Sequence, residues 1–140
     1  MVAVEIDRHV LPALRETLAP FDNCAIMHAD ALTVDMAGLV AGWEGPVKIV
    51  ANLPYYITTP LIIRCLIDLP ACERRVLMIQ KEAAARVLAG PGSKLYAPLA
   101  VLVSGFGAAH RELTVPADAF FPRPGVDSCL IRMIEDRKLQ

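Results

Sequence analysis

The stretch VKIVANLPYYITTPL (residues 47–61) decides the fold, because it joins a predicted strand to a predicted helix through a short polar and aromatic loop. VKIVA (47–51) is nearly all apolar, which is expected of a strand that is buried on both faces of a sheet. Thr59 followed by Pro60 is typical of a helix start, since the first helical turn does not need the amide hydrogen that proline lacks. The stretch therefore predicts a strand, a loop and a helix in succession.

The rest of the chain repeats this alternation of apolar runs and helical stretches. Strands are expected at residues 2–6, 24–28, 75–79, 108–114 and 128–134, and further helices after Asp7, over 80–90 and over 95–105. Asp7 is the expected cap of the first of these helices, in which Pro12 removes a hydrogen bond unless the helix starts late. Strands that alternate with helices predict an α/β fold with a mostly parallel sheet. A proline-rich elbow (PADAFFPRPG, 116–125) separates the last two strands.

The composition is that of a folded domain. The chain has 140 residues, of which 55 % are hydrophobic and 21 % charged, so it can build a core and disorder is not expected. No apolar run approaches the roughly 20 residues of a membrane helix, and no secretory signal is visible. We therefore expect a cytoplasmic protein. The net charge of −1 is unlike the basic surplus of most nucleic-acid binders, so such a role requires local basic patches or further segments.

The four cysteines are widely spaced and form no C-x-x-C pair. This spacing favours reduced, buried thiols over a metal site, and no metal is expected.

Ligands of parallel sheets bind beyond the carboxyl ends of the strands, which directs attention to the residues there. Glu5 ends the first predicted strand, and a carboxylate at that place can accept hydrogen bonds from both hydroxyls of a ribose. The alternative is a solvated side chain near a helix start. Asp30 follows the second strand and can accept a hydrogen bond from an adenine amine. The alternative for Asp30 is a turn residue or helix cap.

The four residues from Asn52 to Tyr55 form a more specific pattern than either of these single carboxylates. The lone pair of an exocyclic base amine is delocalised into the ring, so two acceptors around its hydrogens favour the tetrahedral geometry that a nucleophile needs. The Asn52 side-chain oxygen can be one acceptor, and a backbone carbonyl held by the rigid Leu53–Pro54 step can be the other. Tyr55 can stack on a base that has left its helix. The alternative is an Asn-x-Pro turn with tyrosines packed at a sheet edge, and packing is expected for Tyr56.

These residues belong to a set of stretches that resembles the ribosomal RNA adenine dimethyltransferase family, which moves methyl groups from S-adenosylmethionine to adenine amines. The stretches are AVEIDRHV (3–10), HADAL (28–32), VANLPYYITTPL (50–61), IQKEAAARVLAGPGSKLY (79–96) and VPADAFFPRPGVDSCLIRM (115–133). They occur in the order of the family. The QKE segment and the F-x-P-x-P-x-V-x-S pattern from Phe120 to Ser128 distinguish this family from other amine methyltransferases.

The resemblance implies roles for individual residues. The catalytic loop comprises Asn52, Leu53, Pro54 and Tyr55. The residues implied in binding S-adenosylmethionine are Glu5, Ile6, Asp30, Ala31 and Asn52. Tyr55 and Phe120 would grip the target adenine from its two sides, although plain packing is the alternative for Phe120. Arg123 is a candidate phosphate contact, and a solvated surface charge is its alternative.

The resemblance also implies a Rossmann-like S-adenosylmethionine-dependent methyltransferase sheet whose C-terminal strand is antiparallel. Residues 1–140 are expected to form a partial catalytic domain that lacks the first strand of the family, its glycine-rich turn and its helical, RNA-binding C-terminal domain. The eight glycines include no G-x-G. In the family this strand lies between those expected at 2–6 and 47–51, so we expect two unpaired edges, low stability and weak cofactor binding.

The implied activity is N6,N6-dimethylation of adenines in small-subunit (16S-type) ribosomal RNA during maturation of the subunit. The expected partner is this RNA or a pre-30S-type subunit, and we expect a monomer that does not bind membranes. Two alternatives remain open. One is a related methyltransferase that acts on large-subunit RNA or on DNA, and the other is a non-catalytic RNA-binding or assembly remnant.

Overall fold

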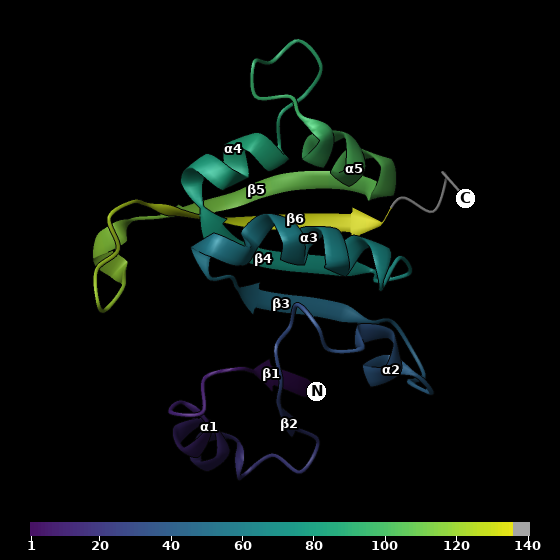
Figure 1. Cartoon of the computed structure of the whole chain (residues 1–140), viewed down its shortest axis with the longest axis vertical. Helices are drawn as coiled ribbons and strands as arrows, with labels where there is room; N and C mark the ends of the chain where they lie inside the picture. Colours follow the sequence, from purple (N-terminus) through teal and green to yellow (C-terminus); the bar gives the residue numbers. More distant parts are fainter. Residues whose placement is uncertain (136–140) are drawn as a thin grey trace. The chain divides into compact units, whose positions relative to one another are not determined.

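A computed structural model describes residues 1–135 and divides the chain into two compact units, Met1–Gly42 and a second unit that begins at Trp43. Figure 1 shows the elements of both units with their labels. None of the helices within residues 1–135 has the length and apolar character that crossing a membrane requires.

The first unit contains a pair of parallel strands. Its elements are β1 (Val2–Glu5), α1 (Leu11–Leu18), β2 (Ala25–His28) and the short α2 (Met36–Val40). β1 and β2 pair in parallel from Val2 opposite Ala25 to Glu5 opposite His28. The carboxyl ends of both strands therefore lie at the same edge, as predicted.

The prediction that Asp7 caps the first helix is wrong. α1 begins at Leu11, and Pro12 lies in its first turn, where its missing amide hydrogen costs nothing. Asp7 instead accepts a hydrogen bond from the backbone N–H of His9 at 2.8 Å, which closes a local turn before the helix. The late start removes the conflict between Pro12 and the helix.

The second unit contains a four-stranded sheet. Its elements in order are β3 (Lys48–Asn52), the 3₁₀ turn η1 (Tyr55–Ile57), α3 (Thr58–Ile67), β4 (Arg74–Gln80), α4 (Lys81–Val87), α5 (Pro98–Phe106), β5 (Gly107–Val115), the 3₁₀ turn η2 (Ala117–Ala119) and β6 (Ser128–Glu135). The strand order is β3-β4-β6-β5. β3 and β4 are parallel, and β6 is antiparallel to both of its neighbours. The prediction of a mostly parallel sheet with an antiparallel C-terminal strand is confirmed.

Alternate residues of the two central strands build the core of this unit. In β4 the buried positions are Arg75, Leu77 and Ile79. The apolar residues buried around them come from β6 and the covering helices and include Ile131, Met133, Leu61, Ile62, Leu66, Ala100 and Val103. Each large apolar side chain buried in this way contributes about 1.5–3 kcal/mol. The helix α5 contacts both α3 and α4, so the three helices form one layer against the sheet (Figure 1).

β3 does not have the burial that its sequence predicts. Its residues alternate between exposed and half-buried, and the side chain of Val50 is 81 % exposed. The physical reason is its position, because within this unit's described residues β3 pairs only with β4 and is an edge strand. The prediction that Tyr56 is packed is also wrong, since this side chain is 85 % exposed.

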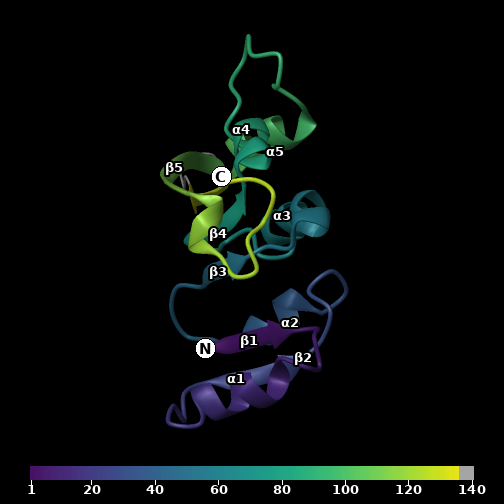
Figure 2. The ribbon, with the colours of Figure 1, turned by 90° about the vertical axis from the view of Figure 1, so that its left-hand side faces the viewer.

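The elbow (116–125) lies at the carboxyl ends of β3 and β4 and faces the viewer in Figure 2. It brings a segment from late in the chain beside the loop that follows β3, which is the arrangement on which the candidate site depends. All four cysteines are free, and Cys65, Cys72 and Cys129 are buried, as predicted, whereas Cys24 is half-buried.

Candidate functional site

The loop after β3 is fixed at both of its ends. Asn52 is the last residue of β3, and the backbone N–H of Leu53 donates to the carbonyl of Met78 in β4 at 3.0 Å. The Leu53 side chain is buried. The carbonyl of Pro54 accepts from the N–H of Ile57 at 3.2 Å and from the Thr58 hydroxyl at 3.3 Å. These bonds fix the loop between the sheet and the start of α3. The prediction that Thr59 caps this helix is wrong, because α3 begins at Thr58 with Ile57 in the cap position.

Asp127 fastens the elbow to the same unit. Its Oδ1 accepts from the backbone N–H of Ala117 at 3.1 Å, and its carbonyl accepts from the N–H of Lys81 at 3.0 Å. The Lys81 ammonium also lies 3.8 Å from Asp127 Oδ2. One carboxylate thus ties both ends of the elbow together and joins them to the first residue of α4. Sequence reasoning quoted Asp127 within a motif and missed this role.

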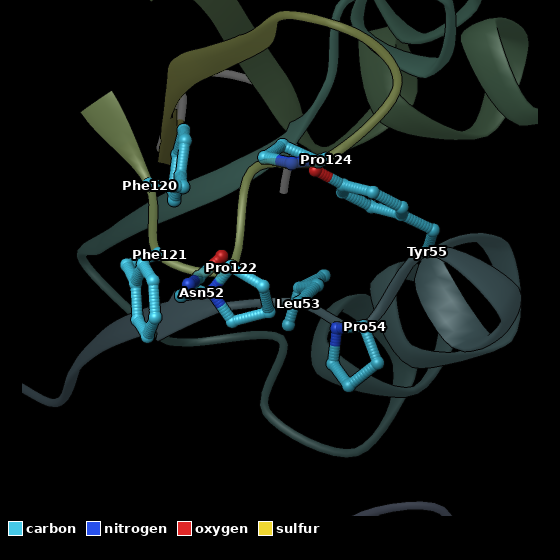
Figure 3. Close-up of a pocket in the computed structure, with 8 residues that line it drawn as sticks. All are labelled: Asn52, Leu53, Pro54, Tyr55, Phe120, Phe121, Pro122 and Pro124. Carbon is cyan, nitrogen blue, oxygen red and sulfur yellow. The ribbon is translucent and has the colours of Figure 1, made fainter. Parts of the chain in front are cut away.

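The loop and the elbow together enclose an open cavity of about 300 Å³. Its lining residues are Asn52, Leu53, Pro54, Tyr55, Phe120, Phe121, Pro122 and Pro124. Figure 3 shows Tyr55 at one end of the cavity, Phe120 and Phe121 at the other, and Asn52 between them. None of these side chains carries a formal charge at neutral pH, and three are aromatic. The volume and the walls suit a flat, neutral ligand that stacks and hydrogen-bonds.

One hydrogen bond joins the loop to the strand that follows the elbow. The Tyr55 hydroxyl lies 3.3 Å from the hydroxyl of Ser128, which is buried at the start of β6. The Tyr55 ring is therefore held at its far end by the strand that follows the elbow. Sequence reasoning missed this role of Ser128, although the residue closes the quoted F-x-P-x-P-x-V-x-S pattern.

The structure brings five predicted residues together around the cavity: Asn52, Leu53, Pro54, Tyr55 and Phe120. Arg123 is on the same elbow and is exposed, but it does not line the cavity. Phe121, Pro122 and Pro124 also line it and were not singled out from the sequence. The F-x-P-x-P pattern contains them, yet a pattern alone does not indicate which of its side chains face a cavity.

Glu5 and Asp30 lie beyond the carboxyl ends of β1 and β2 in the first unit. Glu5 Oε1 accepts from the backbone N–H of Asp7 at 2.7 Å, and Asp30 Oδ1 accepts from that of Leu32 at 2.8 Å. Asp30 therefore forms the turn that its alternative interpretation expects. Within residues 1–135 the second oxygen of each carboxylate has no hydrogen-bond partner in the structure, so each retains an acceptor. This arrangement fits a ribose hydroxyl at Glu5 and an adenine amine at Asp30.

The other two predicted cofactor residues adjoin these carboxylates. Ile6 is 58 % exposed, and its carbonyl lies 3.1 Å from Nε2 of His28, which ties the turn after β1 to the end of β2. Ala31 is half-buried beside Asp30. An exposed isoleucine next to the carboxylate that is predicted to contact a ribose can cover the face of an adenine. The first unit thus holds Glu5, Ile6, Asp30 and Ala31 at one edge of its sheet.

Comparison with known proteins identifies related sequences over nearly the whole chain. The family model described as ribosomal RNA adenine dimethylase matches residues 1–139. Ribosomal RNA small subunit methyltransferase A of Alkaliphilus metalliredigens is 44 % identical over 135 residues, which cover 95 % of this chain and 47 % of the relative. The protein of the same name from Lysinibacillus sphaericus is 42 % identical over 139 residues, covering 96 % and 47 %. The chain spans about half the length of the curated relatives it matches.

Two solved structures share the fold of the chain. A dimethyladenosine transferase from Plasmodium falciparum superimposes with a TM-score of 0.85 and 26 % identity, over 99 % of this chain and 48 % of that one. The 23S rRNA methyltransferase ErmE superimposes with a TM-score of 0.81 and 26 % identity, over 97 % and 52 %. Both similarities extend over the two units.

Proposed function

Because the chain belongs to the ribosomal RNA adenine dimethylase family, we propose that it is part of an enzyme that methylates adenines of small-subunit ribosomal RNA. The reaction transfers methyl groups from S-adenosylmethionine to the N6 amine and gives N6,N6-dimethyladenine. Residues 1–140 form part of its catalytic domain. The cavity lined by the Asn52–Tyr55 loop and the elbow is the observation that carries this proposal.

The loop supplies the two acceptors that an adenine amine requires. The side chain of Asn52 is exposed and lines the cavity, so its oxygen is available to one N–H of the amine. The carbonyl of Pro54 is already engaged by Ile57 and Thr58, whereas the Leu53 carbonyl has no partner in the described part of the chain. Leu53 is therefore the residue whose backbone oxygen receives the second N–H. Pro54, with φ −57° and ψ 137°, holds the loop in this form.

Aromatic rings position the base for the reaction. Tyr55 stacks on one face of the extruded adenine, with its ring held by Ser128, and Phe120 contacts the base from the elbow. Positioning of this kind is worth several kcal/mol of the barrier, because it replaces a chance encounter by a fixed geometry. Among the described residues, none of those that line the cavity is Asp, Glu or His. None is needed, since the amine proton becomes acidic once the nitrogen is alkylated and is lost to water.

The first unit has the side chains that S-adenosylmethionine requires. Glu5 and Asp30 each keep one carboxylate oxygen for the ribose and for the adenine amine, and Ile6 and Ala31 adjoin them. When bound, S-adenosylmethionine would supply an electrophilic methyl group on its sulfonium. Asn52 is proposed to contact both this donor and the target amine.

A second candidate substrate is an adenine of large-subunit ribosomal RNA. The similarity to the 23S rRNA methyltransferase ErmE, with a TM-score of 0.81, favours it. The curated relatives named as small-subunit enzymes are more similar in sequence, at 44 % and 42 % identity, and favour the first candidate. Assays with unmethylated small and large subunits side by side separate the two.

The test is methyl transfer from labelled S-adenosylmethionine to unmethylated small subunits, with the chain and with any longer natural protein that contains it. Asn52→Ala is expected to lower the rate by about 10²-fold or more, because it removes a preorganised hydrogen bond to the reacting amine. Asn23→Ala is the matched control, since Asn23 is exposed and is neither a lining residue of the cavity nor one of the proposed cofactor residues. Circular dichroism should show the same fold for both variants. A full rate in Asn52→Ala would remove this residue from the chemistry.

A further inference from the structure

Phe121 is an aromatic side chain of the second unit that the proposed reaction does not use. It lines the cavity, yet its own surface is fully exposed. Its neighbour Phe120 is half-buried. Phe120 has an extended backbone, with φ −112° and ψ 149°, so successive side chains project to opposite sides. Figure 3 shows the two rings pointing in opposite directions from the elbow. One aromatic residue therefore faces into the unit while the next faces out.

The elbow holds Phe121 in a defined place at the rim of the cavity. Pro122 and Pro124 fix two of the backbone angles that follow it. Asp127, just after the elbow, accepts hydrogen bonds from Ala117 near the start of the elbow and from Lys81 at the start of α4. An exposed aromatic ring on a segment with these constraints, next to a cavity suited to a base, is a feature of binding loops. Tyr56 is nearly as exposed but does not line the cavity.

We propose that Phe121 is a second base-stacking position, which binds the unpaired nucleotide next to the adenine held in the cavity. The inference rests on the proposed function, because it needs a single-stranded RNA that has one base in the cavity. When that base leaves its stack, the face of its neighbour is uncovered. An exposed ring at the rim can cover this face without regard to base identity, since every base has a π-face. Arg123, exposed two residues further on, can contact the phosphate between the two nucleotides.

The experiment compares two RNA stem-loops whose loops contain an unpaired adenine. In the first RNA the neighbouring nucleotide has its base, and in the second it is abasic. Fluorescence anisotropy measures the dissociation constant of each RNA with the wild-type chain and with its variants. Phe121→Ala is expected to weaken binding of the first RNA by roughly 5- to 150-fold, the range of base–aromatic stacking, and to leave binding of the abasic RNA unchanged. Phe121→Trp should retain the affinity of the wild type.

Tyr56→Ala is the matched control and should bind both RNAs like the wild type, because Tyr56 is outside the cavity. Equal affinity of the wild type and Phe121→Ala for the first RNA, whether strong or weak, overturns the inference. An equal loss of affinity of Phe121→Ala for both RNAs also overturns the inference. So does a lower thermal midpoint of Phe121→Ala without RNA, because it would show that the ring packs on protein. The methyl-transfer assay gives a separate readout. A Phe121 effect on RNA binding, with no methyl transfer either by the chain or by any longer natural protein that contains it, would refute the proposed activity and leave the second stacking position in place.

Discussion

Replacing Arg75 with methionine should strongly destabilise the second unit. Arg75 is in β4 and is only 1 % exposed, and its guanidinium donates to the carbonyls of Cys65 at 3.1 Å, Cys72 at 3.1 Å and Leu69 at 2.5 Å. These carbonyls belong to the end of α3 and to the turn before β4. A single side chain therefore closes the connection between α3 and the strand that supports the Asn52–Tyr55 loop.

The size of the expected fall in stability follows from the hydrogen bonds that the three carbonyls lose. The Leu69 carbonyl also accepts from the N–H of Cys72 at 3.0 Å and keeps this bond in the variant. The carbonyls of Cys65 and Cys72 lose the only partner that the described part of the chain gives them. A buried polar group left without a partner costs about 1–3 kcal/mol, so the free energy of unfolding should fall by roughly 2–6 kcal/mol. This loss is a large part of the 5–15 kcal/mol that is typical of a domain.

The measurement is urea unfolding followed by circular dichroism, which gives the free energy of unfolding where the transition is cooperative. Arg74→Met is the matched control, because Arg74 precedes Arg75 in the same strand and is exposed. Its effect should stay within about 0.5 kcal/mol. Arg75→Lys keeps the positive charge with one nitrogen in place of three, so its free energy of unfolding should fall less than that of Arg75→Met. This variant allows the comparison with Arg74→Met to be made if Arg75→Met does not fold. Similar losses in Arg74→Met and Arg75→Met would refute the reasoning.

Two further predictions concern one hydrogen bond and one thiol. Tyr55→Phe and Ser128→Ala each remove the 3.3 Å contact between the two hydroxyls and should each lower the free energy of unfolding by about 0.5–1.5 kcal/mol. The double variant should lose little more than either single one in the same urea assay, and strictly additive losses would contradict the contact. Burial raises the pKa of Cys65 from 9.0 to about 11, so the thiol ionises first in the unfolded chain. The stability that the neutral thiol contributes is complete below pH 9 and is lost as the pH rises to about 11. The free energy of unfolding of Cys65→Ala should therefore fall less steeply over this pH range than that of the wild type, whereas Cys24→Ala should follow the wild type.

The order of the elements could be predicted because each leaves a local signal. Apolar runs of strand length and a proline in a first helical turn placed β1 to β6 and most helices to within a few residues. The prediction for Asp7 was wrong for a local reason, since an aspartate before a helical pattern can either cap the helix or close a separate turn. The loop from Asn52 to Tyr55 could be singled out as a candidate because its four residues combine an amide, a fixed backbone angle and an aromatic ring.

Other features depend on tertiary contacts that no local pattern encodes. Arginine is rarely buried fully, so nothing in RVLMI (75–79) indicates that its first residue donates to three carbonyls. Phe120 and Phe121 are adjacent and chemically identical, yet one is half-buried and the other fully exposed. Their difference comes from the extended backbone at Phe120, which projects successive side chains to opposite sides. The sequence could predict five of the eight residues that line the cavity, but not which of their faces remain open.

β3 shows most clearly how sequence and position can disagree. Its apolar residues are those of an inner strand, but within its unit it has one strand partner and leaves Val50 81 % exposed. Natural edge strands avoid such surfaces with charge, proline or a bulge, because an open apolar edge recruits other chains. Val50 and the free edge are separate observations: the side chain of Val50 leaves an apolar position uncovered on a face of the sheet, whereas the unpaired backbone of β3 is suited to a second neighbouring strand. The resemblance predicts a neighbour of the same kind, the glycine-rich first strand of the family. The Asn52–Tyr55 loop begins at the end of β3, so a strand added in parallel at this edge would end beside the cavity that the loop lines.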